Sequence, residues 1–400
     1  MKTTIKLAVA SALVAAASSA QAGITIPAGD WTLDIGGLVN AYYTTSKFSG
    51  DTGAGASALG LGTDQSSRNN ITTGLLTNYL SVSGKSRQND LDVGFTISIN
   101  PGASTSNSGV QSAQQENRQA FLTFGDKSWG SIKLGKDLGI YASDAVLNDM
   151  TLLGVGGGAG SLSGNTTTLG RIGSGFVYAD WKSQVAYSSP NWNGFSFTVG
   201  LTQGWNAVAA ESLNSASGTE RSGAQSAYEG KASYEWAGDV AGKVWASGIS
   251  QRVSLTGAAG ADRATAFDIG TTVNVAGFGL TGYYGQGDGI GQTFQLRNGF
   301  DATGKSRDSD QWYLQGTYTL PGVGTKLGVS YGESTLDGNS TDTFSEVQDS
   351  MITVGAYHPL TKHLNLVAEY SESERELDRR ANSTLDAKEK TISLGAILFF

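Results

Sequence analysis

The sequence contains two histidines and no cysteine, so few of its side chains could serve as a catalytic base, a thiolate nucleophile or a soft metal ligand. Proteases and lipases usually use a histidine beside a nucleophile or an acid. His358 and His363 instead flank the short turn "PLTK". Two histidines could also bind zinc, but a pair on either side of a solvated turn is the commoner arrangement. We therefore predict no catalytic residue, no metal site and no bound cofactor.

The glycine-rich run "GVGGGAGSLSG" at residues 154–164 could be taken for a phosphate-binding loop. A P-loop requires Gly-Lys-Ser or Gly-Lys-Thr at the start of a helix that follows a strand, and no such sequence follows here. Because glycine has no Cβ, it lets a backbone pass close to another surface. The run therefore predicts a loop that packs closely against an inner surface, not a nucleotide site.

The final ten residues, "TISLGAILFF", show the pattern that dominates the chain. Apolar side chains occupy every second position, with threonine, serine and glycine between them. Since successive side chains of a strand point to opposite faces, this pattern predicts a strand with one apolar and one polar face. The same alternation occurs at residues 91–99, 195–202, 267–275 and 326–331, and less regularly at 242–255. Helical periodicity is nearly absent, so we predict an all-β fold.

Charged residues lie on the polar face of these strands, where a dry protein core would exclude them. They are Asp92, Lys133, Asp268, Lys326 and Glu369. Tryptophans collect near the predicted strand ends, as in the aromatic girdles of membrane barrels; they are Trp31, Trp129, Trp192, Trp236 and Trp312. A soluble sandwich or propeller also consists of many short strands. The charged face and the aromatic strand ends favour a membrane barrel with a water-filled interior.

Short and long connections alternate along the chain. The short ones carry turn residues and lie at 88–90, 126–130, 190–194, 238–242, 276–279, 321–325 and 359–363. The long ones lie near 49–67, 103–116, 138–173, 207–225, 256–264, 291–308, 339–347 and 378–387. Seven short and eight long connections join sixteen strands, which is the outer-membrane pattern of periplasmic turns and external loops.

The first 22 residues have the features of a secretory signal: the basic residues Lys2 and Lys6, an apolar middle, and the small-residue cleavage site Ala20-Gln21-Ala22. No later stretch is apolar for long enough to form a transmembrane helix. The formal net charge of −8 makes nucleic acid a poor partner. No linker divides residues 23–400. We predict a signal peptide at 1–22 and one domain, a 16-stranded antiparallel transmembrane β-barrel in the outer membrane of a Gram-negative cell.

Residues 121–181 carry the most specific sequence pattern: "FLTFGDKSWGSIKLGKDLG", a long insertion, and then "LGRIGSGFVYADW". With this pattern and the predicted barrel, the mature chain resembles the general porins of Gram-negative bacteria, most of all the branch found in proteobacteria outside the enteric group. The likeness runs from about residue 30 to residue 400. In that family the insertion is loop 3, which folds back into the barrel and narrows the pore. The strand after loop 3 opens with Gly-Arg-x-Gly.

The resemblance implies a passive, water-filled channel for ions and small hydrophilic solutes, with loop 3 at about residues 138–173. It implies a homotrimer surrounded by outer-membrane lipids and lipopolysaccharide. The C-terminal Phe400, with Leu398, resembles the signal that such barrels present to the outer-membrane assembly machinery. The sequence departs from the family at Leu153, where an acid is usual, and at Asn78 or Tyr79, where an arginine is usual. We therefore expect a less charged constriction than in the enteric members.

An eyelet with acids on one side and bases on the other sets up a transverse field that polar solutes can follow. The acidic candidates are Asp149 and Asp144, and the basic candidates are Arg171, Arg118 and Lys133. Asp149 in "NDMTLLG", Arg171 in "GRIG" and Arg118 match family positions. The alternation places Lys133 on the polar face, because Ile132 and Leu134 must face lipid.

Two other functions and one charged segment remain to be considered beside the general porin. A substrate-selective channel could use aromatic side chains as a track for one solute class, with Tyr42, Tyr43, Tyr141 and Trp181 as candidates. An outer-membrane enzyme would need its site at the external rim, whereas the histidines fall on the periplasmic side. The charged run "SESERELDRR" at residues 371–380 is read as a solvated face that passes into a long loop, or as a site for divalent cations that bridge to lipid phosphates.

Overall fold

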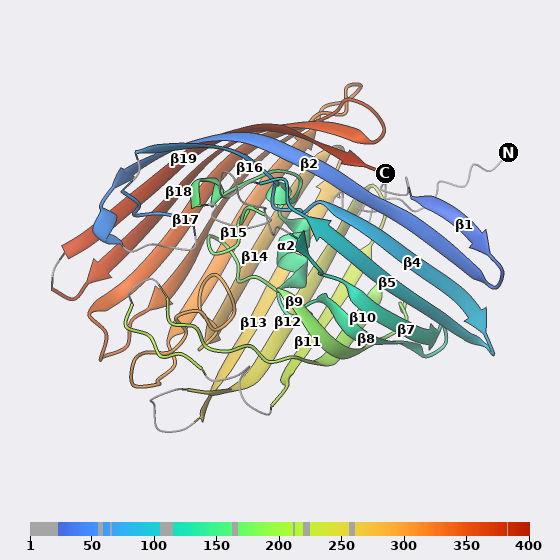
Figure 1. Cartoon of the computed structure of the whole chain (residues 1–400), viewed down its shortest axis with the longest axis horizontal. Coiled ribbons are helices and arrows are strands. Elements are labelled where there is room, and N and C mark those ends of the chain that lie inside the picture. Colours follow the sequence, from blue (N-terminus) through green and yellow to red (C-terminus); the bar gives the residue numbers. More distant parts are fainter. Residues whose placement is uncertain are drawn as a thin grey trace.

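Sixteen antiparallel strands close into a barrel in the computed structural model of the chain, which confirms the predicted fold class (Figure 1). The structure describes residues 23–54, 59–64, 66–104, 115–161, 167–210, 213–218, 225–255, 261–381 and 383–400. The strands of the ring are β2 (Trp31–Gly50), β4 (Tyr79–Gln88), β5 (Leu91–Pro101), β7 (Ala120–Asp126), β8 (Gly130–Leu138), β9 (Trp181–Ser188), β10 (Phe195–Thr202), β11 (Ala227–Trp236), β12 (Val240–Ser254), β13 (Ala261–Val275), β14 (Phe278–Asp288), β15 (Asp308–Thr319), β16 (Lys326–Asp337), β17 (Phe344–Pro359), β18 (Leu364–Arg379) and β19 (Ser383–Phe399). Each pairs with the next, and β19 pairs with β2 to close the ring.

Three shorter strands complete the ring. β1 (Ile24–Ala28) and β19 lie along the same edge of β2, one after the other. β3 (Ser67–Thr72) pairs with the part of β2 that continues beyond its pairing with β4, and β6 (Gln115–Glu116) does the same beside β5. The ring therefore has no free edge along β2, where the first and last strands of the chain meet.

The predicted alternation decides which side chains face inward. In β19, Ile392, Leu394 and Leu398 are exposed on the outer face, while Thr391 and Ser393 are buried on the inner face. The charged residue Asp268 also points inward from β13, between the exposed Phe267 and Ile269. The outer face is thus apolar over most of the ring, as a barrel surrounded by lipid requires.

Aromatic pairs lie on the outer face near the short turns, as the girdle prediction requires. Trp192 stacks on Phe195 with the ring centroids 6.2 Å apart, and Phe278 stacks on Tyr318 at 4.3 Å. Trp312 differs from the other predicted girdle tryptophans because it lies within β15, toward the opposite end of the barrel, where it packs on Tyr331.

Three of the predicted long connections are short in the structure, so this part of the prediction is wrong. The links that follow β12, β16 and β18 occupy only residues 255–260, 338–343 and 380–382, because the strands continue past the apolar band. The charged run at 371–380 lies almost wholly within β18 and does not pass into a long loop. There Glu374 pairs with Lys388 of β19 at 2.5 Å. Polar residues on both faces predict a loop, but a strand outside the lipid needs no apolar face.

Helices are few and short. The described residues include α2 (Ser143–Asn148) and three 3-10 turns, η1 (Thr52–Ala54), η2 (Met150–Leu153) and η3 (Ala159–Ser161). Figure 1 shows α2 within the ring of strands. Within the described part of the chain, no helix has the length and apolar character needed to cross a membrane.

Candidate functional site

The described residues of the segment between β8 and β9 (residues 139–180), which are 139–161 and 167–180, lie inside the barrel. Their backbone and side chains form hydrogen bonds with inward-facing groups of β2, β3, β11, β12 and β15 to β19. The segment is longer than the predicted loop at 138–173, because the next strand opens only at Trp181. Arg171 therefore lies within this segment, and the prediction that Gly-Arg-x-Gly opens the following strand is wrong.

A carboxylate of β11 fixes the start of the segment. One oxygen of Glu229 accepts hydrogen bonds from the backbone N–H groups of Ile140 and Tyr141, at 2.8 and 2.9 Å. The other oxygen accepts from Lys182 Nζ at 2.6 Å and from Thr202 Oγ1 at 2.7 Å. Glu229 and Lys182 have no exposed side-chain surface. A buried ion pair is tolerable because the remaining hydrogen-bonding capacity is used, here by the backbone of the inserted segment.

A second carboxylate, from β18, fixes the glycine-rich part. Glu369 accepts hydrogen bonds from the N–H groups of Val155 and Gly156 at 2.7 and 3.0 Å, and from the Tyr357 hydroxyl at 2.6 Å. A Cβ on Gly154 would lie 2.0 Å from the Glu369 carboxylate. This confirms the prediction that the glycines allow close packing against an inner surface.

Asp149 and Arg171 are brought together in the middle of the segment. The Asp149 carboxylate accepts hydrogen bonds from the backbone N–H groups of Thr151 at 3.0 Å and of Arg171 at 3.2 Å. The Arg171 guanidinium donates to the carbonyl oxygens of Met351 at 2.8 Å and Ser174 at 3.3 Å. Both residues are 0% exposed, so neither side chain touches water in the channel. Burial raises the pKa of Asp149, although nearby Arg171 opposes the shift.

Asp144, the other acidic candidate, lies in α2 between two lysines. It pairs with Lys243 of β12 at 2.6 Å and with Lys231 of β11 at 3.1 Å. Burial by itself would raise the pKa of Asp144, but the two lysines outweigh it and lower the pKa below its ordinary value. Both lysine side chains are partly exposed, so this cluster reaches water.

The remaining basic candidates lie at the β7–β9 part of the barrel. Lys133 points inward from β8, pairs with Asp137 and lies over the Phe121 ring. Arg118, just before β7, donates to Glu116 at 2.7 Å, and its guanidinium carbon lies 5.6 Å from the centre of the Trp181 ring. The structure therefore separates the five candidates into three groups: Asp149 with Arg171, Asp144 with β11 and β12, and Arg118 and Lys133 near β7 to β9.

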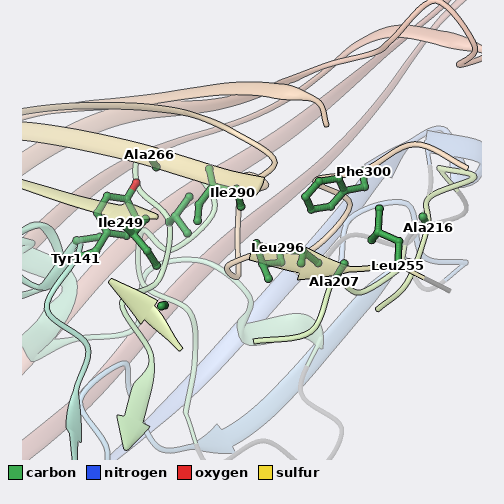
Figure 2. Packing of buried hydrophobic residues seen from close by; sticks show 14 residues of the cluster. Tyr141, Ala207, Ala216, Ile249, Leu255, Ala266, Ile290, Leu296 and Phe300 are labelled. Carbon is green, nitrogen blue, oxygen red and sulfur yellow. The ribbon is translucent and has the colours of Figure 1, made fainter. Parts of the chain in front are cut away.

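Described residues of two further connections pack beside the inserted segment. Ala207 and Ala216, from the link after β10, and Ile290, Leu296 and Phe300, from the link after β14, belong to one buried apolar cluster. Figure 2 shows Tyr141, Ile249 and Ala266 beside Ile290 at one end of this cluster, with Phe300 and Ala216 at the other. Arg307 holds the arrangement, since its guanidinium binds Asp342 at 2.6 and 2.9 Å and the Leu213 carbonyl oxygen at 3.0 Å.

An open polar cavity remains on the side of the barrel that these segments do not fill. It has a volume of about 650 Å³, and its lining includes Asp34, Ser83, Lys85, Thr96 and Gln119. These residues belong to β2, β4 and β5 or lie just before β7. The inserted segments thus lie mainly against β11 to β19, and the polar cavity lies beside β2, β4 and β5.

The residues proposed as an aromatic track do not form one. Tyr42 and Tyr141 are buried, and Tyr43 is exposed on the outer face. Trp181 alone borders a cavity at the β7–β9 side. The histidines lie at the turn between β17 and β18, where His358 Nδ1 is 2.9 Å from Thr325 Oγ1. Sequence reasoning missed Glu229 and Lys182 as anchors of the inserted segment; their inward position in alternating strands was the available signal.

A family model described as Gram-negative porin matches residues 8–377 of the sequence. The chain belongs to the Gram-negative porins. None of the curated proteins matches the sequence of this porin significantly. A barrel of this family is an outer-membrane channel for small solutes, and the polar cavity described above is consistent with that role.

Solved structures share the fold of this porin at low sequence identity. The anion-selective porin from Comamonas acidovorans has a TM-score of 0.62 and 15% identity, over 92% of this chain and 100% of that chain. The outer membrane channel DcaP of Acinetobacter baumannii has a TM-score of 0.67 and 15% identity, over 94% and 99%. A trimer form of the Vibrio cholerae outer membrane protein OmpT has a TM-score of 0.54 and 13% identity, over 92% and 99%.

Proposed function

We propose that this porin is a passive channel for ions and small hydrophilic solutes, narrowed by residues 139–180. The observation that carries the proposal is the set of hydrogen bonds from this segment to inward-facing groups on many strands, which fix it at the level of the barrel interior. A segment held in this way reduces the cross-section without closing the polar cavity beside β4 and β5.

Two groups of charged residues are proposed to set the field along the water path. Lys133 and Arg118 border the β7–β9 side, and Asp144 lies with Lys231 and Lys243 on the other. Asp149 and Arg171 act in this proposal by holding the segment in shape, because neither is exposed.

The test is single-channel recording of the refolded mature protein in a planar bilayer, under a salt gradient. We expect stepwise conductance, and a reversal potential that moves toward cation preference in Lys133→Gln. Arg87→Gln, at the exposed periplasmic turn, is the matched control and should leave it nearly unchanged. Absence of any step from a barrel that resists SDS would overturn the channel, and an unchanged potential in Lys133→Gln would overturn the assignment of Lys133.

Export and assembly complete the proposal. Cleavage after Ala22 would leave Gly23 as the first residue, and β1 begins directly after it. Intact mass of the protein purified from outer membranes tests this cut. Phe400, with Leu398 on the same outer face, is proposed as the signal to the assembly machinery, and deletion of Phe400 should reduce the folded amount in the membrane.

A homotrimer in a lipid and lipopolysaccharide environment is also proposed. The Vibrio cholerae protein with the same fold has a trimer form, and the outer face of this barrel exposes apolar side chains over most strands. Mass measurement of the protein in detergent distinguishes a trimer from a monomer. No cofactor is proposed.

A further inference from the structure

A small cavity borders the channel at the start of β9. Its volume is about 180 Å³, several times the roughly 30 Å³ that one water molecule occupies in the liquid. Residues from the inserted segment, from the chain before β7 and from the link after β14 line it. None of the roles proposed above for residues 139–180 uses this space.

One side of the cavity is apolar. Leu75, Leu169 and Ile172 contribute aliphatic surface. Tyr178 and Phe294 pack edge to face with their ring centres 6.2 Å apart. Their positions are fixed because the Tyr178 backbone N–H donates to the Thr293 carbonyl oxygen at 2.9 Å. This side can receive an aliphatic or aromatic group of a solute.

The other side carries charges of both signs. Arg118 lines the cavity together with two carboxylates, Glu116 and Asp180, and pairs with Glu116 at 2.7 Å. The Arg118 side chain is mostly buried, whereas Glu116 is 47% exposed and opens the cavity to water. The Arg118 guanidinium lies over the Trp181 ring, so this face of the ring is already occupied.

Asp180 is held in an unusual backbone conformation. Its φ is 59°, a left-handed value that non-glycine residues seldom adopt. One carboxylate oxygen accepts the Trp181 backbone N–H at 2.7 Å. Among the described residues, no hydrogen bond is made to the second oxygen, Oδ2. Burial raises the pKa of Asp180, an effect that an incoming cation would oppose.

These features together select against several classes of solute. A simple anion would meet two carboxylates, and a simple cation would meet Arg118. A sugar could pair some hydroxyl groups with Thr167, Thr168 and the charged side chains, but it would leave others unpaired against the leucine and isoleucine side chains, at a cost for each. A zwitterion with an apolar side chain matches both the charged side and the apolar side of the cavity. Its ammonium group faces a carboxylate, its carboxylate faces Arg118, and its side chain covers the apolar surface.

We propose that this cavity binds apolar α-amino acids of about the size of leucine on their way through the channel. The proposal rests on the proposed function, because the solute reaches the site through the water path. It names the solute class that this path favours.

The experiment compares L-leucine with probes that each lack one feature, using single-channel current in a planar bilayer. Isocaproate lacks the ammonium group, isoamylamine lacks the carboxylate, and glycine lacks the apolar side chain; glucose serves as the uncharged solute. We expect concentration-dependent current blocks by leucine, and affinities about tenfold or more lower for every other probe. A hydrogen bond to a charged group contributes about that much, and so does the burial of an aliphatic side chain, which glycine lacks.

Two variants place the effect at the cavity. Asp180→Asn should remove the preference for leucine over isocaproate, and asparagine tolerates the left-handed backbone. Arg118→Gln should remove the preference for leucine over isoamylamine. Asp92→Asn and Arg87→Gln make the same charge changes at the exposed periplasmic turn and should preserve both preferences.

The outcomes separate the two proposals. Conductance steps without leucine blocks, blocks of equal strength by glucose or glycine, or unchanged preferences in both cavity variants would overturn the amino-acid site and leave the channel intact. Absence of conductance would overturn the channel. Calorimetric titration of leucine into the detergent-solubilised barrel then decides the site independently, since a lack of binding heat there would overturn it as well.

Discussion

Replacing Glu369 with alanine should release the glycine-rich part of residues 139–180 from the barrel wall. Glu369 is 4% exposed, and it accepts two backbone hydrogen bonds from Val155 and Gly156 and one from the Tyr357 hydroxyl. The change leaves both N–H groups buried without an acceptor, at about 1–3 kcal/mol each. The state in which the segment is attached to the barrel wall thus loses about 2–6 kcal/mol of stability. The equilibrium constant between the attached and detached states shifts about 30-fold or more toward the detached state.

The assay is single-channel recording combined with liposome swelling in sugars of increasing size. We expect greater current noise, higher mean conductance and uptake of larger sugars, because the detached segment no longer holds a fixed cross-section. Glu374→Ala is the matched control. Glu374 lies on the same strand, but its side chain is on the outer face of the barrel, where it pairs with Lys388 and does not contact the described part of residues 139–180. A folded Glu369→Ala barrel with wild-type noise and size limit would refute the reasoning.

Further predictions concern the same segment and its neighbours. Gly154→Val should reproduce the Glu369→Ala phenotype in both assays, since a Cβ at Gly154 would lie 2.0 Å from the Glu369 carboxylate; wild-type conductance would contradict the packing. Arg307→Leu leaves Asp342 buried and unpaired, which should lower the free energy of unfolding by about 3–5 kcal/mol, measured by denaturation in detergent against Arg87→Gln. Burial raises the pKa of Asp301, but hydrogen bonds from Thr341 and Thr303 outweigh it and lower the pKa to about 2. Because the folded pKa lies below the unfolded value, the stabilisation is present above about pH 4 and lost as the pH falls toward 2; proteolysis at residues 301–307 should increase over that range in wild type but not in Asp301→Asn.

The strands were predictable because their signal is local. A few consecutive residues, as at 391–400, are enough to recognise the alternation of polar and apolar side chains. This alternation correctly predicted that Asp268, Lys326 and Glu369 lie on the inner face. The ends of the strands were less predictable. Beyond the lipid both faces of β18 can be polar, so residues 371–380 carry no apolar alternation to show that the strand continues.

The arrangement inside the barrel was only partly predictable. The insertion between β8 and β9 was evident from its length, but its anchors are contacts between residues far apart in sequence. Glu229 binds the backbone of Ile140 across 89 positions, and a backbone N–H carries no residue-specific signal. Arg171 is expected at the start of a strand because of its Gly-Arg-x-Gly motif, whereas it lies inside the segment, where its guanidinium bonds locally to Ser174 and, as a tertiary contact, to Met351 of β17.

The meeting of the two chain ends on β2 makes the barrel nearly cyclic. The Phe400 N–H donates to the Gly37 carbonyl oxygen at 3.0 Å, the Gly37 N–H donates to the Phe400 carbonyl oxygen at 2.8 Å, and Ile24 pairs with Ile35 further along the same edge. Strand pairing therefore continues around the ring, and only the covalent chain is interrupted between residue 400 and residue 23. A circular permutant that joins residue 400 to residue 23 and opens the turn at 320–325 keeps every strand neighbour, so the order of synthesis is separable from the architecture of the pore.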